Sequence, residues 1–319
     1  MPFNPKEQIV PMKSEVGEFF SYVIAGPGGT GKSTLLGYMA EYIKKTYGKK
    51  TLLIATLPRE KRSWKYQELG SDYIDHVLIE DSDWRPDLNK FNADGFSKMM
   101  ELLTWLETDE SYGGIILDNG TEHAEQAWHA ALAPLRVASP ADISDGKSRW
   151  LPYDRLASML DQSIKSLVSL TTAENPKYVG IAWHVQAPKE DTTETVEGTK
   201  ITKTSADKGA KGVEYEGDVL PQIRGQYRRK LINQVDAMLY TEIANRRGMV
   251  DGKIQEQVEY MIQVRANPER HTKLPGPMPE VPYIPNNFAT LVQVMRNEYK
   301  PVLKDSAPEV NLTFSLKKK

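Results

Sequence analysis

The stretch IAGPGGTGKSTLLGYM, from Ile24 to Met39, has the most chemically specific spacing in the chain. Its segment from Gly26 to Ser33 fits the pattern G-x-x-x-x-G-K-[ST], whose glycines let backbone N–H groups converge on phosphate oxygens. An apolar run precedes the segment and a helical pattern follows it, so a helix N-terminus adds positive potential at the same place. The stretch is therefore predicted to bind the phosphates of a nucleotide.

Each polar member of this segment has an expected role. Lys32 is expected to reach the β- and γ-phosphates, and Ser33 to ligate Mg²⁺. Thr34 is expected to cap the helix or to contact the α-phosphate. The sequence has no N-K-x-D stretch of the kind that reads guanine, so ATP with Mg²⁺ is the expected cofactor pair. The backbone of the phosphate cradle is assigned to Gly26, Gly28, Gly29, Thr30 and Gly31.

An acidic residue ends another apolar run, GGIILDN, which reads as a buried strand. If this strand is parallel to the one before the phosphate loop, Asp118 lies at the same sheet edge and suits a Walker-B metal contact. The alternative is a strand-end Asp that caps a turn with Asn119 and Gly120. The need of a phosphate loop for such a partner favours the metal contact.

Hydrolysis also needs a carboxylate or Gln beside the attacking water, and the sequence leaves two candidates open. Glu60 follows the second predicted strand, and Glu122 follows Asp118 at the start of a predicted helix. Either residue could instead be a solvated or helix-capping Glu. His184 and Gln186 end the fifth predicted strand and are predicted to sense the γ-phosphate, with a solvent-facing polar pair as the alternative.

Hydrophobic periodicity predicts how the chain positions these groups. Buried strands alternate with amphipathic helices, which indicates an α/β fold with a mostly parallel sheet and helices on both faces. Two later strands around a polar turn at 246–253 indicate antiparallel additions near the C-terminal end. The predicted strands are 22–25, 50–58, 75–80, 113–119, 177–185, 236–245 and 258–266, and the predicted helices are 33–47, 96–107, 122–135 and 153–173.

The expected organisation is a lead-in at 1–20, a core at 21–287, and a C-terminal helix and basic tail at 288–319. Two stretches inside the core, about 137–152 and 187–220, are polar and lack periodicity. Gaps of that length inside a compact domain are usually functional or mobile loops.

Composition excludes several classes of site. The 319 residues include no Cys, which rules out disulfides, zinc–thiolate sites, iron–sulfur clusters and cysteine nucleophiles. The formal net charge of −2 means that any nucleic-acid contact must use a local patch. No run approaches the roughly 18 apolar residues of a membrane span, and the N-terminus lacks an apolar signal region, so a cytoplasmic protein is expected.

The order of several segments resembles a RecA-type ATPase core, and more narrowly the phage-encoded RecA-like ATPases. These are core-only recombinases that are grouped functionally with single-strand-annealing proteins. The segments are GPGGTGKST, LLIATLPRE, GGIILDN, GIAWHVQ, a long polar loop and LPQIRGQYRRKLINQVDAMLYTEI, within about residues 20–275. The resemblance implies a RecA-like P-loop fold, ATP hydrolysis, single-stranded DNA as partner, a ring or filament of identical subunits, and a place beside phage replication or recombination proteins in the host cytoplasm.

The resemblance also assigns further residues. His184 ends the sensor strand, the element from Pro221 to Gly225 follows the long loop, and Asp236 lies near the start of a later strand. The family commonly has a Lys/Arg element that reaches a neighbouring subunit's nucleotide. This chain has no Lys-x-Arg pair there, so Lys273, and after it Arg270, are the candidates. Pro58 and Arg59 separate Glu60 from its strand more widely than the family pattern does.

Single-stranded DNA is expected to contact the two polar loops, because Lys and Arg neutralise phosphates and aromatic rings stack on bases. The first loop contains Arg149 beside Trp150. In the second loop acidic residues outnumber lysines, but lysines concentrate in 200–211, so this part is the better candidate; a solvated flexible loop is the alternative. The stretch YRRK could touch DNA, a neighbour's γ-phosphate or solvent. The candidate DNA-binding residues are Arg149, Lys200, Lys203, Lys208, Lys211, Arg228 and Arg229.

Two other classes share the phosphate loop. A RecA- or AAA-type helicase or helicase loader fits the same site, although no second helical lid domain is evident for the AAA version. A small-molecule or nucleotide kinase needs a lid that is often rich in Arg. The stretch 187–220 contains no Arg, which argues against a kinase.

Overall fold

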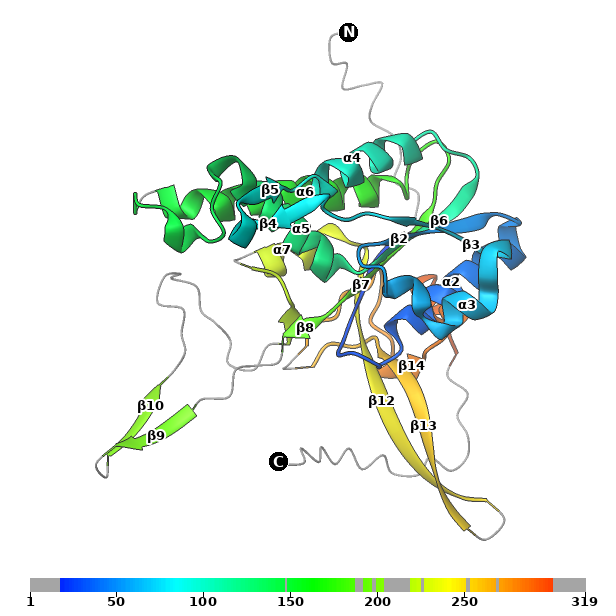
Figure 1. Cartoon of the computed structure of the whole chain (residues 1–319). Coiled ribbons are helices and arrows are strands. Elements are labelled where there is room, and N and C mark those ends of the chain that lie inside the picture. The colour runs from blue at the N-terminus through cyan, green and yellow to red at the C-terminus, as the bar shows by residue number, and fades with distance from the viewer. Residues whose placement is uncertain are drawn as a thin grey trace, which may run out of the picture.

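The computed structural model describes residues 18–146, 148–186, 192–196, 199–203, 219–224, 227–250, 253–267 and 270–300. An eight-stranded sheet with the order β14-β13-β12-β1-β7-β6-β2-β3 forms the centre (Figure 1). Six strands run parallel: β1 (Ser21–Ala25), β2 (Lys50–Ala55), β3 (Ile74–Leu78), β6 (Tyr112–Asp118), β7 (Tyr178–Trp183) and β12 (Ala237–Val250). Then β13 (Lys253–Gln263) pairs antiparallel with β12, and β14 (Tyr283–Pro285) antiparallel with β13.

Helices cover both faces of this sheet (Figure 1). Side chains of α2 (Lys32–Tyr47), α3 (Trp64–Leu69) and α8 (Phe288–Met295) share one apolar cluster with Tyr22 and Ile24 of β1. The opposite cluster contains Val23 and Ala25 together with side chains of α4 (Gly95–Leu106), α5 (Gly120–Leu132), α6 (Leu151–Ser169) and α7 (Tyr227–Gln234). Alternate residues of β1 thus enter opposite layers, as the pleat of a strand requires.

Short elements connect this framework. Two small hairpins are β4 (Asp83–Arg85) with β5 (Lys90–Asn92), and β9 (Thr192–Val196) with β10 (Thr199–Lys203); β8 (Val185–Gln186) pairs with β11 (Leu220–Pro221). The 3-10 turns are η1 (Glu60–Arg62), η2 (Gly70–Asp72), η3 (Pro86–Leu88), η4 (Ala133–Leu135), η5 (Pro140–Asp142) and η6 (Ser148–Trp150). Among the described residues, no helix is both long and apolar enough to cross a membrane.

The predicted α/β fold with a mostly parallel sheet and antiparallel strands near the C-terminal end is confirmed. The predicted polar turn at 246–253 is wrong, because the β12–β13 ladder continues to the pair Val250 and Lys253. Polar composition suggested a turn there, but a sequence as polar as this one can pair in a ladder of backbone hydrogen bonds. The stretch 187–220 is not wholly aperiodic either, because Thr-rich segments in it form the β9–β10 hairpin, and Thr favours strands.

Candidate functional site

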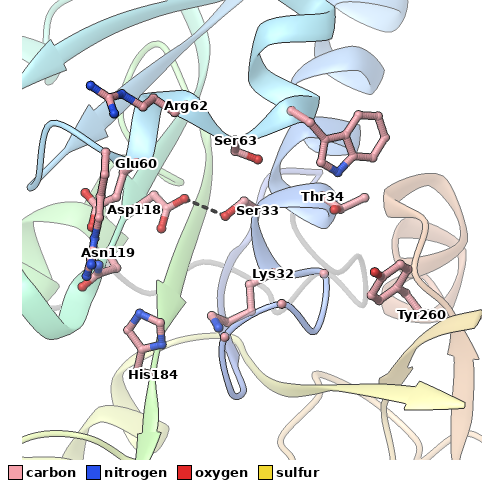
Figure 2. Close-up of a pocket in the computed structure, with 15 residues that line it drawn as sticks. Lys32, Ser33, Thr34, Glu60, Arg62, Ser63, Asp118, Asn119, His184 and Tyr260 are labelled. Carbon is pink, nitrogen blue, oxygen red and sulfur yellow. Dashed lines mark hydrogen bonds between the residues drawn. The ribbon is translucent and has the colours of Figure 1, made fainter. Parts of the chain in front are cut away.

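The carboxyl ends of four neighbouring strands surround one pocket of about 580 Å³ (Figure 2). The phosphate loop follows β1, η1 follows β2, Asp118 ends β6, and His184 follows β7. The pairing of β7 with both β1 and β6 confirms that the fifth predicted strand lies beside the fourth. The lining residues are Gly28, Gly29, Gly31, Lys32, Ser33, Thr34, Arg59, Glu60, Arg62, Ser63, Trp64, Asp118, Asn119, His184 and Tyr260.

Two residues from the C-terminal part of the chain, Thr241 of β12 and Asn286 after β14, brace the phosphate loop. Gly31 adopts φ 93°, which favours glycine, and its carbonyl accepts a hydrogen bond of 2.9 Å from Asn286 Nδ2. Thr30 does not line the pocket, because its hydroxyl donates to the Pro27 carbonyl (2.8 Å) and lies 2.6 Å from the Thr241 hydroxyl. A side chain at Gly26 would meet that Thr241 hydroxyl at 2.3 Å. The loop is thus fixed by packing within the chain itself.

Lys32 lies folded over its own loop. Its ammonium donates to the carbonyls of Gly26 (2.8 Å) and Pro27 (2.7 Å). Burial lowers the Lys32 pKa to about 8, although the charge of Asp118 opposes the shift. A nearby phosphate would favour the charged ammonium for the same electrostatic reason that Asp118 does.

Ser33 and Asp118 form the pair expected of a magnesium site. The Ser33 hydroxyl donates to Asp118 Oδ2 at 2.9 Å (Figure 2), and the Tyr66 hydroxyl donates to the same oxygen at 3.0 Å. Burial raises the Asp118 pKa, while the two hydroxyls and the Lys32 charge oppose the increase. Adjacent hydroxyl and carboxylate oxygens are the hard ligands that Mg²⁺ prefers, so the donor set fits this ion. In place of the alternative turn capped by Asp118, α5 begins directly after Asn119, whose Oδ1 accepts from Glu122 N at 2.7 Å as the N-cap.

Glu60 faces the pocket, whereas Glu122 is not among the residues that line it. The turn through Pro58 and Arg59 folds the Glu60 carboxylate back to the end of β2, where Oε2 accepts from Thr56 N and Leu57 N at 2.8 Å each. Asn119 Nδ2 donates to the other oxygen. The two intervening residues therefore do not displace Glu60 from the site.

The ionisation of Glu60 suits proton transfer near neutral pH. Burial, followed by the charge of Asp118, raises the Glu60 pKa to about 7, although its backbone hydrogen bonds oppose the increase. A carboxylate that titrates near the working pH is an efficient general base. Glu122 lies in the first turn of α5; burial and the charge of Glu125 raise its pKa, but it is not among the residues that line the pocket.

The imidazole of His184 points into the pocket across from Lys32 (Figure 2). Its backbone is held on both sides, because His184 N donates to Thr121 Oγ1 (3.0 Å) and its carbonyl accepts from Gln222 N (2.8 Å). Burial, and then the charges of Lys32 and Arg59, lower the His184 pKa, so the ring is neutral at neutral pH. Gln186 lies in β8 opposite Leu220, and its side chain is outside the described set.

The two candidate fingers toward a neighbouring subunit are engaged within their own subunit. Lys273 Nζ donates to the carbonyls of Val235 (2.6 Å) and Asn233 (3.3 Å) at the end of α7. Arg270 donates to Glu242 and to Gln263 Oε1 (3.1 Å). A role at another subunit's nucleotide stays a prediction, and it would require these bonds to break.

The candidate DNA-binding residues that the structure describes belong to separate elements, and none is among the residues that line the pocket. Lys200 and Lys203 belong to β10, opposite Thr195 and Thr192. Arg149 lies in η6 and donates to the Ile143 carbonyl at 2.9 Å, whereas Arg228 and Arg229 belong to α7. Lys208 and Lys211 lie outside the described residues.

Sequence reasoning missed several pocket residues. Arg59, Arg62 and Trp64 come from the stretch PREKRSWK, whose cations and aromatic ring after a buried strand were a usable signal. Asn119 was considered only as part of a turn. Tyr260 had no local signal, because it reaches the pocket only through the long β12–β13 hairpin.

Comparison with protein-family models and with curated protein sequences finds no match to this chain. The chemical interpretation of the pocket therefore depends on its own geometry. The strongest part of that geometry is the set formed by Lys32, Ser33, Asp118, Glu60 and His184.

Proposed function

We propose that this protein is a RecA-like ATPase that binds and hydrolyses ATP with Mg²⁺. One observation carries the proposal: a phosphate loop, a Ser–Asp oxygen pair, a carboxylate with a pKa near neutrality and a neutral imidazole line one pocket. A phosphate loop and Mg²⁺ ligands are recurring parts of enzymes that hydrolyse a γ-phosphate, and a carboxylate can activate the attacking water.

The residues divide the chemistry as follows. Lys32 exchanges its two loop carbonyls for phosphate oxygens, and the backbone N–H groups of the loop bind the same phosphates. Ser33 and Asp118 would hold Mg²⁺, which neutralises phosphate charge when bound. Glu60 accepts a proton from the attacking water, and His184 forms a hydrogen bond with the γ-phosphate. The exposed rings of Trp64 and Tyr260, at 60% and 42%, offer apolar surface for the base.

The strand order supports a RecA-like assignment. The strand β7, which His184 follows, lies between β1, which precedes the phosphate loop, and β6, which ends in Asp118. This order brings a third polar group to the γ-phosphate side of the pocket, in addition to the loop and the metal ligands. Within the described residues no feature favours a kinase over an ATPase, and a helicase or helicase-loader motor would use the same ATP site.

The proposed polymer partner is single-stranded DNA, in phage recombination or single-strand annealing. The chain continues from His184 directly into β8, and then toward the β9–β10 hairpin with Lys200 and Lys203. The hairpin extends away from the sheet (Figure 1), as a contact arm for a long ligand would. A DNA contact there would lie close in sequence to the γ-phosphate sensor. The proposal includes a homo-oligomeric ring or filament in the host cytoplasm, together with other phage replication or recombination proteins.

DNA affinity measured against salt tests the polymer partner. Fluorescence anisotropy with a labelled oligonucleotide, with and without a non-hydrolysable ATP analogue, should give an affinity for single strands that falls with salt concentration. Product analysis in the same conditions should give ADP and free phosphate and no phosphorylated acceptor. Absence of salt-dependent binding would refute single-stranded DNA as the partner. The ATPase proposal would then depend on the product analysis alone.

A further inference from the structure

Arg59 lines the pocket proposed to bind ATP, and hydrogen bonds hold the turn that carries it. It precedes Glu60, whose carboxylate binds the backbone N–H groups of Thr56 and Leu57. The turn is closed by hydrogen bonds from Arg62 N to the Arg59 carbonyl (3.0 Å) and from Glu60 N to the Leu57 carbonyl (3.2 Å). Because Glu60 ties this turn to the end of β2, the Arg59 backbone is fixed beside the pocket.

The side chain of Arg59 adds a positive charge to the part of the pocket that holds His184. Arg59 lines the pocket, and its charge, like that of Lys32, lowers the His184 pKa. In the part of the chain that the structure describes, Arg59 makes no salt bridge within 4.0 Å, although its charge also reaches Glu122. Two cations therefore act on His184, and Glu122, the described carboxylate that senses the Arg59 charge, forms no ion pair with it. Such a place suits an anion.

We propose that Arg59 binds the γ-phosphate of ATP held in its own subunit and stabilises the charge that develops there during hydrolysis. This inference rests on the proposed ATPase function. In that reaction water forms a bond to the γ-phosphorus and passes a proton to Glu60, while the bond from the γ-phosphorus to the bridging oxygen breaks. The electron pair of the broken bond stays on ADP. The planar N–H fork of Arg59 donates to the γ-phosphoryl oxygens throughout.

Three other cations that could serve this role are less suited to it. Lys273 is bonded to the end of α7, and Arg270 is bonded to Glu242 and Gln263. Arg62 belongs to the same turn as Arg59, but its side chain points away from Lys32 and the phosphate loop in Figure 2. An arginine supplied within the same subunit would let hydrolysis proceed without a finger from a neighbour.

The matched control comes from the same turn. Lys61 is exposed and does not line the pocket, so K61A removes one positive charge from η1 without touching the site. We expect R59A to lower kcat for phosphate release by at least about 100-fold, and R59K to recover part of the loss. K61A should keep kcat within about threefold of the wild type. ADP affinity should stay within about threefold in all three variants, because ADP lacks the γ-phosphate.

Two further measurements separate transition-state binding by Arg59 from a structural role, and action within a subunit from action on a neighbour. ADP with aluminium fluoride, which mimics the transferring phosphoryl group, should be trapped by the wild type and K61A but not by R59A. Mixing R59A with K32A should restore no activity, because neither subunit then has both Arg59 and an intact phosphate loop. Restored activity in the mixture would overturn action within one subunit.

Phosphate release by the wild type distinguishes an error about Arg59 from an error about the ATPase function. If the wild type neither binds ATP nor releases phosphate, the ATPase proposal fails and the role of Arg59 fails with it. If the wild type releases phosphate, and R59A keeps kcat within about threefold and still traps ADP with aluminium fluoride, only the role of Arg59 is overturned.

Discussion

Replacing Glu60 with Gln changes one oxygen to an NH₂ group inside a closed set of hydrogen bonds. The carbonyl oxygen of the new glutamine can still accept from Thr56 N and Leu57 N. The glutamine NH₂ group then faces the NH₂ group of Asn119. Asn119 cannot rotate its amide without losing the 2.7 Å bond that its Oδ1 accepts from Glu122 N. One hydrogen bond is therefore lost in E60Q, at a cost of about 1–3 kcal/mol in folding free energy.

The effect of E60Q on hydrolysis should be larger. Loss of a general base lowers a rate by about 10²–10⁴-fold, which corresponds to about 3–5 kcal/mol in the activation barrier. The pH profile adds a second signature. A base must be ionised and Lys32 must keep its charge to bind the phosphates, so kcat/KM of the wild type should rise about tenfold per pH unit below the Glu60 pKa of about 7 and fall above the Lys32 pKa of about 8. E60Q should lose this rise.

The assay is steady-state phosphate release from Mg-ATP between roughly pH 5.5 and 8.5, with E122Q as the comparison variant. Glu122 lies in the first turn of α5, shortly after the end of β6. It does not line the pocket, so E122Q should retain activity. Far-UV circular dichroism and ATP-analogue binding check that E60Q is folded and still binds nucleotide. Activity of E60Q within about threefold of the wild type, or an equal loss in E122Q, would refute Glu60 as the base.

Three other changes test separate parts of the structure. D118N should remove the Mg²⁺ dependence of ATP-analogue binding, because it neutralises the carboxylate that shares a hydrogen bond with Ser33; an unchanged Mg²⁺ midpoint in a fluorescence titration would contradict this. G120A should lower the free energy of unfolding by about 1–3 kcal/mol in urea denaturation, since its new methyl group would lie 2.3 Å from the Trp183 ring, whereas G146A, with open space around it, should not. K200E combined with K203E should weaken single-stranded DNA binding and flatten the dependence of log K on log salt by about 1–2, whereas K300E should leave both unchanged; equal slopes in anisotropy titrations would remove β10 from the DNA contact.

Local patterns were enough to predict the parts of the site that belong to the central strands. The runs that become β1 and β6 are mostly apolar, because both faces of these strands are covered; β1 leads into the phosphate loop, and β6 ends in Asp118. The spacing of the phosphate loop predicts its own conformation, with positive φ at Gly29 and Gly31. The regular alternation of strands and helices then places Asp118 and His184 at the same edge.

Long-range contacts were outside the reach of these patterns. Thr241 and Asn286 brace a loop more than 200 residues before them, and nothing in their neighbouring sequence indicates that contact. Tyr260 enters the pocket because the β12–β13 register sets it opposite Ile243. The choice between Glu60 and Glu122 likewise required the geometry of the turn after β2.

The same limitation applies to side chains with two plausible partners. Lys273 carries a charge that suits either a neighbouring nucleotide or helix carbonyls, and in the structure it caps α7. Its sequence context, a basic segment next to prolines, is compatible with both. Which partner a long cation contacts depends on what folding brings within its reach.

Phosphate release from ATP by the full chain tests the central claim most directly. The measurement compares the wild type with K32A, each with and without Mg²⁺ and single-stranded DNA. We expect release of equal amounts of ADP and phosphate that requires Mg²⁺, increases with single-stranded DNA and disappears in K32A, because the Lys32 ammonium, which donates to two carbonyls of its own loop, is proposed to turn to the phosphates. Phosphate release by the wild type that does not exceed that of K32A under any of these conditions would contradict it.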